Sequence, residues 1–232
     1  MNARRVEGRF QNILFDLDGT LTESRPGIVR SIQHAVAAIG FEPPSAENLL
    51  WCVGPPLPAI FARVLAREQN DALIAQAIEL YLERYETLGL LESRLYEGAS
   101  EMLSALARAA EARLVLVTTK RAVTADRVLR AFSMRDQFEA IFGADTAGLG
   151  GKTESVRMAL EQLALEPSVT AIVGDRSFDI VAGKQNGVFT IGVSYGYGAR
   201  EELAAAGADQ ICASPAEVLQ FLSAPGLKSR RR

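Results

Sequence analysis

The chain has 232 residues, of which 48% are hydrophobic and 23% charged, and its net charge is −3. These values are typical of a globular protein with one large or two smaller domains, and they argue against nucleic acid as an obligatory partner. No stretch approaches the ~20 apolar residues of a membrane span, and no apolar segment of signal-peptide length follows the charged N-terminus. We therefore expect a cytoplasmic monomer or homodimer with reduced thiols at Cys52 and Cys212 and a solvated basic end at 228–232.

A pair of acids follows the first apolar run. Residues 12–15 read Asn-Ile-Leu-Phe, which predicts a buried strand, and Asp16 and Asp18 come directly after it. Side chains two apart in a strand point to the same side, and two like charges this close need a cation or a shared proton. The pair therefore predicts a metal site, acid–base chemistry or both. The alternative is a simple turn, since Asp and Gly are common turn residues.

Residues 23–96 have helical periodicity and almost no strand signal. Pro26 suits a first helical turn, and apolar residues recur at helical spacing from there to Gly40. Further helices are predicted at 48–52, 57–68 and 71–88. This part of the chain is predicted to be a compact all-helical block.

From Gly98 onward, strands alternate with helices. The continuous apolar run at 113–117 is typical of a parallel strand covered on both faces. The alternation predicts an α/β fold with a doubly wound parallel sheet. Because one strand precedes the helical block and the others follow it, we expect a core of residues 1–22 and 97–232, with an inserted helical domain, 23–96, over the end of the first strand. The other predicted strands are 138–142, 169–173, 188–193 and 209–212. The helix after the strand at 113–117 is predicted to end near 132, and the later helices are predicted at 153–163, 177–185, 200–206 and 215–222.

Polar residues follow three predicted strands, at the edge of the sheet where ligands bind in α/β folds. Thr118 and Thr119 follow the second strand, and Asp175 follows a later one, with Asp179 one helical turn further on. Thr118 at a helix start favours an anion, and Lys152, after a run of glycines, suits a phosphoryl group. Taken singly, Thr118 and Asp175 are also good helix caps, and Lys152 also suits a solvated helix start outside any P-loop pattern.

Together, four motifs resemble those of the haloacid dehalogenase superfamily of phosphatases, in order and in spacing, over nearly the whole chain. The helical insertion resembles the mobile cap of that superfamily, and the rest resembles its Rossmann-like core. Gly54-Pro55-Pro56-Leu57 and residues 195–203 resemble the phosphoglycolate phosphatase group, above all its 5′-nucleotidase-like branch. The four motifs are Phe15-Asp16-Leu17-Asp18-Gly19-Thr20-Leu21-Thr22, Val117-Thr118-Thr119-Lys120, Gly151-Lys152 and Gly174-Asp175-Arg176-Ser177-Phe178-Asp179.

The resemblance implies a role for each catalytic residue. Asp16 is implied to be the nucleophile that forms an aspartyl-phosphate. Asp18 is implied to be the general acid for the leaving alcohol and then the base for water. Thr118, Thr119 and Lys152 are implied to bind the phosphoryl oxygens.

The resemblance also implies a Mg²⁺ site. Asp16, Asp175 and a main-chain carbonyl at Asp18 would bind the ion, and Asp179 would support that set of ligands. The physical chemistry agrees, because a carboxylate that attacks a phosphate dianion is repelled, and a divalent cation and a lysine reduce the repulsion. The expected activity is Mg²⁺-dependent hydrolysis of a small phosphorylated metabolite, with phosphoglycolate as the first expectation.

Four alternatives stay open. A 5′-nucleotidase and a phosphosugar mutase share the motifs and the cap. A dehalogenase is disfavoured, because that chemistry needs neither a metal nor the acid at Asp18. A binding module that has lost turnover is disfavoured too, because every matched catalytic residue is present.

Five further residues carry weaker predictions. Arg176 stands where many relatives have a small hydroxyl residue, and we predict a salt bridge for it at a helix start. His34 is predicted to be a half-exposed structural residue, and Trp51 a core aromatic rather than a pocket wall. Arg25 and Arg63 are predicted to be solvated helix charges rather than substrate contacts.

Overall fold

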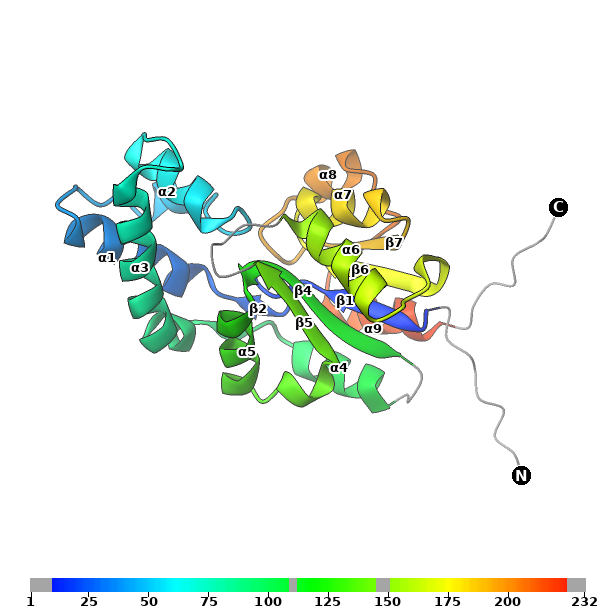
Figure 1. Cartoon of the computed structure of the whole chain (residues 1–232). Coiled ribbons are helices and arrows are strands. Elements are labelled where there is room, and N and C mark those ends of the chain that lie inside the picture. Colours follow the sequence, from blue (N-terminus) through cyan, green and yellow to red (C-terminus); the bar gives the residue numbers. More distant parts are fainter. Residues whose placement is uncertain (1–9, 109–111, 145–150, 225–232) are drawn as a thin grey trace, which may run out of the picture.

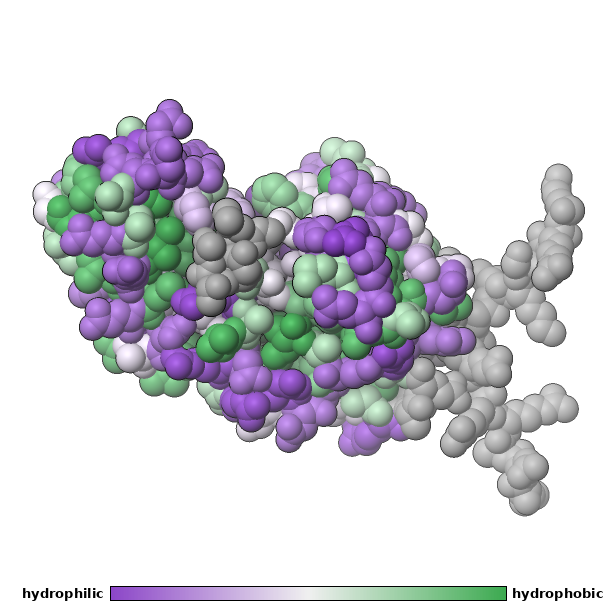
Figure 2. Space-filling view, in the orientation of Figure 1, coloured by the Kyte–Doolittle hydropathy of each residue, from purple (hydrophilic) through white to green (hydrophobic). Residues whose placement is uncertain are grey.

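The structure, a computed structural model, describes residues 10–108, 112–144 and 151–224. These residues form a smaller and a larger lobe, with a depression between them (Figures 1 and 2). Within the described ranges, no helix is long and apolar enough to span a membrane. The predicted solvated end at 228–232 and the glycines at 148 and 150 lie outside the described residues.

Six parallel strands form the sheet of the larger lobe, in the order β5-β4-β1-β6-β7-β8. The chain starts at the centre of the sheet and then builds outward on both sides. This arrangement confirms the predicted doubly wound α/β fold. The strands are β1 (Asn12–Phe15), β4 (Arg113–Arg121), β5 (Ala140–Ala144), β6 (Thr170–Gly174), β7 (Phe189–Val193) and β8 (Gln210–Cys212).

Helices cover both faces of this sheet. In β1, Ile13 and Phe15 point into one hydrophobic cluster and Leu14 into the other. The first cluster includes residues of α4 (Ala99–Arg108), α5 (Ala122–Ala131) and α9 (Pro215–Ser223), and the second residues of α6 (Lys152–Gln162) and α7 (Ser177–Gln185). The central strands β1 and β6 are buried along their whole length, so they are apolar runs that were visible in the sequence, whereas the edge strands β5 and β8 are partly exposed. The remaining core helix, α8 (Arg200–Ala205), packs on β7.

The smaller lobe is the predicted helical block. It contains α1 (Arg25–Ala38), α2 (Leu57–Leu65) and α3 (Ala72–Thr87), and α1 packs along α3. The helix predicted at 57–68 ends earlier, because Ala66 adopts a left-handed conformation with φ of 53°. The helix predicted at 48–52 is a short 3₁₀ helix, η1 (Glu47–Leu49). The other 3₁₀ helices are η2 (Gly89–Glu92), η3 (Arg135–Gln137) and η4 (Pro167–Val169).

A short antiparallel pair, which the sequence did not predict, joins the two lobes. Thr22 of β2 (Thr22–Glu23) lies opposite Leu95 of β3 (Arg94–Leu95). Two-residue strands are too short to show a periodicity. Their pairing returns the chain to the place where it left the core, so the helical lobe lies beyond the C-terminal end of β1. We propose residues 23–96 as the cap domain, with this pair as its base.

The register of the sheet decides which residues meet at that edge. Phe15, the last residue of β1, is aligned with Leu116 of β4 and Val173 of β6. Asp16 therefore leaves the sheet between the two strands that lead to Thr118 and Asp175.

Candidate active site

The ends of β1, β4 and β6 bring the predicted site residues together under the cap. Asp16, Thr118 and Asp175 come from these three strand ends, Lys152 from the start of α6 and Asp179 from the first turn of α7. All five are buried, and Asp175 is 0% exposed. Buried polar groups of this kind need partners inside the protein or a ligand.

Three carboxylates share one space. Asp16, Asp175 and Asp179 each contribute an oxygen that lies within 4.8 Å of the other two. Lys152 provides a positive charge among them. Its Nζ lies 2.5 Å from Asp16 Oδ1 and 2.8 Å from Asp179 Oδ1, and it donates a hydrogen bond of 3.1 Å to the carbonyl of Val117.

One lysine does not neutralise three buried acids. Burial raises the pKa of Asp16 to about 7, against the opposing effect of the Lys152 ammonium. Burial, together with the charges of Asp16 and Asp179, raises the pKa of Asp175 strongly. Burial lowers the pKa of Lys152, but Asp16 and Asp179 raise it more, so Lys152 stays protonated. An excess of buried carboxylate oxygens is the donor set that suits Mg²⁺, so these residues fit the expected ion.

The raised carboxyl pKa values predict how stability depends on pH and on Mg²⁺. When unfolded, Asp16 loses its proton near its ordinary pKa of 3.8, whereas in the folded protein its pKa is about 7. The folded state therefore binds more protons across this range, and the site lowers the stability of the metal-free protein as pH rises from about 4 to about 7. Mg²⁺ compensates the ionised carboxylates. We expect it to raise the melting temperature by roughly 5–10 °C at about 100 times its Kd.

This shift is measured by thermal unfolding with Mg²⁺ or EDTA at about pH 8 and about pH 5.5. We expect a larger shift at the higher pH. The matched control is Asp175→Asn, which keeps the shape of the side chain and should remove most of the Mg²⁺ effect. Equal shifts at both pH values, or an unchanged shift in Asp175→Asn, would contradict the electrostatic account.

Asp175 is held in place by a main-chain N–H, a threonine hydroxyl and two glycines at close range. The N–H of Tyr197 donates to Asp175 Oδ2 at 2.7 Å, and the hydroxyl of Thr20 donates to Asp175 Oδ1 at 3.5 Å. A Cβ on Gly19 would lie 2.2 Å from Asp175 Oδ2, and one on Gly196 would lie 2.4 Å from Asp175 Cβ. Only glycine leaves room for the carboxylate at these two positions. Tyr197 lies in the motif at residues 195–203, but its hydrogen bond to Asp175 was not predicted.

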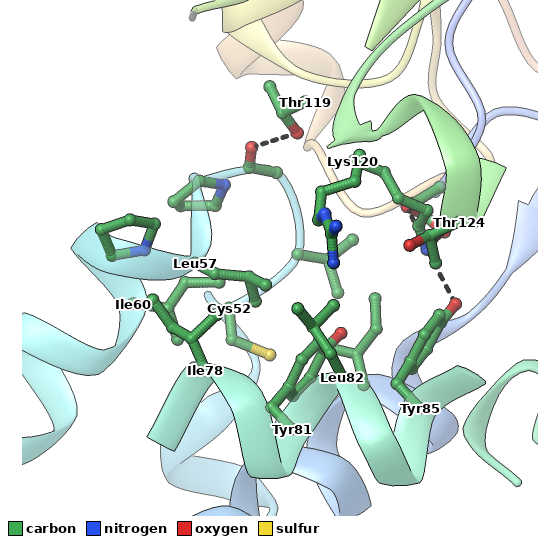
Figure 3. A pocket seen from close by; sticks show the side chains of 17 residues that line it. Cys52, Leu57, Ile60, Ile78, Tyr81, Leu82, Tyr85, Thr119, Lys120 and Thr124 are labelled. Atoms are coloured by element: carbon green, nitrogen blue, oxygen red, sulfur yellow. Dashed lines mark hydrogen bonds and ion pairs between the residues drawn. The ribbon is translucent and has the colours of Figure 1, made fainter. Parts of the chain in front are cut away.

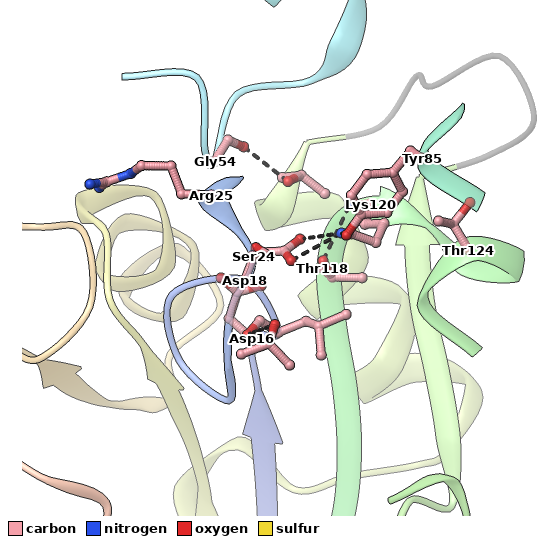
Figure 4. A network of polar contacts seen from close by, with 12 residues as sticks. Asp16, Asp18, Ser24, Arg25, Gly54, Tyr85, Thr118, Lys120 and Thr124 are labelled. Atoms are coloured by element: carbon pink, nitrogen blue, oxygen red, sulfur yellow. Dashed lines mark hydrogen bonds and ion pairs between the residues drawn. The ribbon is translucent and has the colours of Figure 1, made fainter. Parts of the chain in front are cut away.

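Asp18 lies apart from the three clustered carboxylates. Its Oδ2 is 2.8 Å from Lys120 Nζ, which also donates a hydrogen bond of 2.7 Å to the Tyr85 hydroxyl on cap helix α3 (Figure 4). Burial lowers the pKa of Lys120, but Asp18 and Tyr85 raise it more, so this lysine is also charged. The side chain of Asp18 thus faces the cap, which is the place for a group that exchanges protons with a leaving alcohol. The metal ligand predicted at this position is the main-chain carbonyl of Asp18, so the direction of the side chain does not bear on that prediction.

Sequence reasoning missed the role of Lys120. Lys120 was predicted only as the last residue of the second motif, and the register of β4 against β5 shifts between Val117 and Arg121, so the alternation of a regular strand could not place its side chain. The hydroxyl of Thr118 accepts a hydrogen bond of 3.2 Å from the N–H of Lys120. Thr119, which was predicted to bind phosphate, instead directs its hydroxyl to the cap, where it donates to the carbonyl of Gly54 at 2.9 Å. We therefore propose that the Thr119 side chain is a cap contact.

Arg176 joins the core to the cap. Its Nε lies 3.0 Å from Glu202 Oε1, which is the salt bridge that the sequence predicted at this helix start. Its Nη1 also donates a hydrogen bond of 2.8 Å to the carbonyl of Val53, in the cap loop before α2. Together with the bond between Thr119 and Gly54, this contact fixes the cap loop against the strand ends.

Arg176→Gln is expected to lower kcat/KM for a good substrate by roughly tenfold, because the closed cap loses a charge-assisted hydrogen bond. Hydrogen exchange of the backbone N–H groups of residues 52–54 should become faster in the variant. The matched control is Arg200→Gln, an exposed arginine on α8, which should change neither quantity. If both variants behave like the parent protein, the bond does not help to hold the cap closed.

Four weaker predictions have mixed outcomes. Arg25 is half-buried, with its guanidinium carbon 4.2 Å from the centre of the Tyr197 ring, so the prediction that it is solvated was wrong. Arg63 is exposed, as predicted, and lies 3.9 Å over the Trp51 ring, which is only half-buried at the edge of the core. His34 is exposed rather than half-exposed. The sequence could not show these pairings, because each depends on how neighbouring segments pack.

Comparisons with known proteins agree with this geometry. Residues 13–193 match the haloacid dehalogenase-like hydrolase family. A Pseudomonas aeruginosa protein named 5′-nucleotidase is 37% identical over 92% of this chain and 96% of its own length. A phosphoglycolate phosphatase from Vibrio vulnificus is 31% identical over 90% of this chain and 95% of its own. The tyrosine-protein kinase PtkA from Mycobacterium tuberculosis is 38% identical over 81% of this chain and 63% of its own.

Solved structures show the same fold. The crystal structure of a predicted phosphatase from Clostridium acetobutylicum has a TM-score of 0.85 and 32% identity, and the match covers 91% of this chain and 97% of that one. The family match spans the acids that follow β1, the end of β4, Lys152 and the acids that follow β6. The chain belongs to the haloacid dehalogenase-like hydrolases and is a phosphatase of that family.

Proposed function

We propose that this phosphatase is a Mg²⁺-dependent phosphomonoester hydrolase that acts on a small phosphorylated metabolite through an aspartyl-phosphate on Asp16. The observation that carries the proposal is the buried cluster of Asp16, Asp175 and Asp179 around Lys152 at the strand ends. The names of the relatives, 5′-nucleotidase and phosphoglycolate phosphatase, support a small phosphate ester as the substrate.

The reaction has two steps. In the first, a carboxylate oxygen of Asp16 attacks phosphorus, the bond from phosphorus to the alcohol oxygen breaks, and Asp18 gives that oxygen its proton. In the second, Asp18 takes a proton from water while the water oxygen attacks phosphorus. The bond from phosphorus to Asp16 then breaks, so that orthophosphate leaves and the carboxylate is restored.

The remaining residues bind and position. Lys152 and Thr118 hold the phosphoryl oxygens, and Lys120 orients the carboxylate of Asp18 toward the cap. When Mg²⁺ is bound by Asp16, Asp175 and the main-chain carbonyl at Asp18, with Asp179 in support, it neutralises charge on the phosphate. The ion pair of Lys152 with Asp16 keeps the nucleophile next to the group that binds its target.

The experiment is a screen of phosphate monoesters for orthophosphate release, with Mg²⁺, with EDTA, and with Mg²⁺ restored. We expect turnover that EDTA abolishes and Mg²⁺ restores. Isomerisation of a sugar phosphate that needs a bisphosphate activator would favour the mutase alternative. No turnover of any ester with Mg²⁺ would overturn the proposal.

A further inference from the structure

A pocket lies between the cap and the core, directly beyond Asp18. The cap contributes residues of α1, α2, α3 and the loop at 52–55, and the core contributes Asp18 and residues of β4 and α5 (Figure 3). Its volume is about 80 Å³. Since Asp18 is the residue proposed to protonate the leaving alcohol, this pocket is where that alcohol lies. The inference below therefore rests on the proposed function.

The cap side of this pocket is apolar or aromatic throughout. Among the described residues, the cap contributes no acidic, basic or amide side chain to the wall. Tyr81 and Tyr85 lie side by side, with ring centres 5.5 Å apart and planes 7° apart, and both are buried. The cap wall consists of Ile28, Cys52, Val53, Gly54, Pro55, Leu57, Pro58, Ile60, Ile78, Tyr81, Leu82 and Tyr85.

Within the described part of the chain, the charged groups that line the pocket all belong to the core. Lys120 is already paired with Asp18 and bonded to Tyr85. Arg121 is half-buried and forms no ion pair with any residue in the described ranges, so it is the one cation there with no acidic partner. A carboxylate or a polyol that entered the cap half would meet no charged or amide side chain, and only the hydroxyls of Tyr81 and Tyr85, in exchange for the water that it loses.

We propose that this pocket selects phosphate monoesters whose leaving alcohol ends in an apolar, above all an aromatic, group, and that Ile78 and Tyr81 of α3 determine that specificity. An aromatic ring buries its faces against aliphatic and aromatic walls and needs few polar partners. The Tyr81 hydroxyl, which forms no hydrogen bond with any described residue, offers such a ring one polar contact. The leaving alcohol of phosphoglycolate is a two-carbon carboxylate. It would not fill the pocket, and its charge would not match the apolar cap wall.

Binding of non-hydrolysable phosphonates tests the proposal without turnover. Benzylphosphonate and phosphonoacetate share the phosphoryl end and differ in carrying a ring or a carboxylate. With Mg²⁺ present, calorimetry should show that benzylphosphonate binds the unmodified protein at least about tenfold more tightly. Equal affinities, or tighter binding of phosphonoacetate that Arg121→Gln removes, would overturn the proposal and assign Arg121 to an anionic leaving group.

Kinetics of matched esters then test the wall itself. For the parent protein, kcat/KM should be at least about tenfold higher for benzyl phosphate than for 2-hydroxyethyl phosphate. Ile78→Ala should lower the value for benzyl phosphate by roughly tenfold and leave that for 2-hydroxyethyl phosphate within about twofold. Leu80→Ala is the control, because Leu80 is half-buried on the same helix and does not line the pocket. Equal losses for the two esters would overturn the assignment of Ile78.

The two proposals fail in different ways. If no ester is hydrolysed but benzylphosphonate binds more tightly, the proposed reaction is wrong and the pocket still selects aromatic groups. If many esters are hydrolysed and phosphoglycolate is preferred, the reaction stands and the inference on specificity is wrong.

Discussion

Asp16→Asn is expected to reduce orthophosphate release from every substrate by roughly 10⁴-fold or more. An amide oxygen does not attack phosphorus to give a stable phosphoryl intermediate, so the covalent route is closed. The fold should persist, because Asn has nearly the shape of Asp and removes a carboxylate whose pKa burial raises to about 7. Lys152 keeps its contact with Asp179 in the variant.

The measurement combines steady-state phosphate release with rapid acid quenching of a radiolabelled substrate. The parent protein should carry label on Asp16 after quenching, and Asp16→Asn should carry none. Asp18→Asn is the informative companion, because it keeps the nucleophile and loses the proton donor, and label should accumulate with substrates that have good leaving groups. Turnover by Asp16→Asn near the parent rate would show that the phosphoryl group never reaches Asp16.

Lys152→Met is expected to lower kcat/KM by roughly 10²–10³-fold, because the charge that stabilises the transferring phosphoryl group is lost. The same change should destabilise the metal-free protein by roughly 3–5 kcal/mol at about pH 8, since it leaves buried acids with no cation. The side chain of Lys152 is 5% exposed, so water cannot take over its role. The loss of stability should shrink toward about pH 5, where Asp16 is protonated in the folded protein.

Chemical unfolding of the metal-free protein and phosphate release with Mg²⁺ measure the two effects. Lys184→Met is the matched control, because Lys184 pairs with Asp209 at the surface, where an ion pair contributes at most about 1 kcal/mol. If the two variants lose similar amounts of stability and activity, Lys152 is not the counter-charge of the carboxylate cluster.

Much of the fold was readable because its strands are buried on both faces. In a chain that alternates strands and helices, continuous apolar runs such as those of β4 and β6 indicate parallel strands covered by helices on both sides. The polar residues after them were readable for a related reason. Parallel strands present their carboxyl ends at one edge, so Asp16, Thr118 and Asp175 had to meet if the order of strands was right.

What could not be read depends on contacts between segments that lie far apart in the sequence, both within the core and between the two lobes. Lys120 meets Asp18 across 102 positions of sequence, and Arg176 meets the carbonyl of Val53 across 123. Neither pairing leaves a periodic signal in either segment. The two-residue strands β2 and β3 were invisible for the same reason, since their pairing is defined by where the chain returns.

The sequence alone determined the parallel sheet, the helical insertion and the set of acids, threonine and lysine near the strand ends, because apolar runs record burial and the alternation of strands with helices records strand direction. Only the tertiary structure decided which acids cluster, that Asp18 faces Lys120 and Tyr85, and that the space above them has an apolar wall. The clustering of the acids depends on how the strand ends and α7 of the core come together, and the other two features depend on how the cap helices are rotated and seated on the core. That packing is set by many weak contacts between distant segments, and no single stretch of sequence carries it.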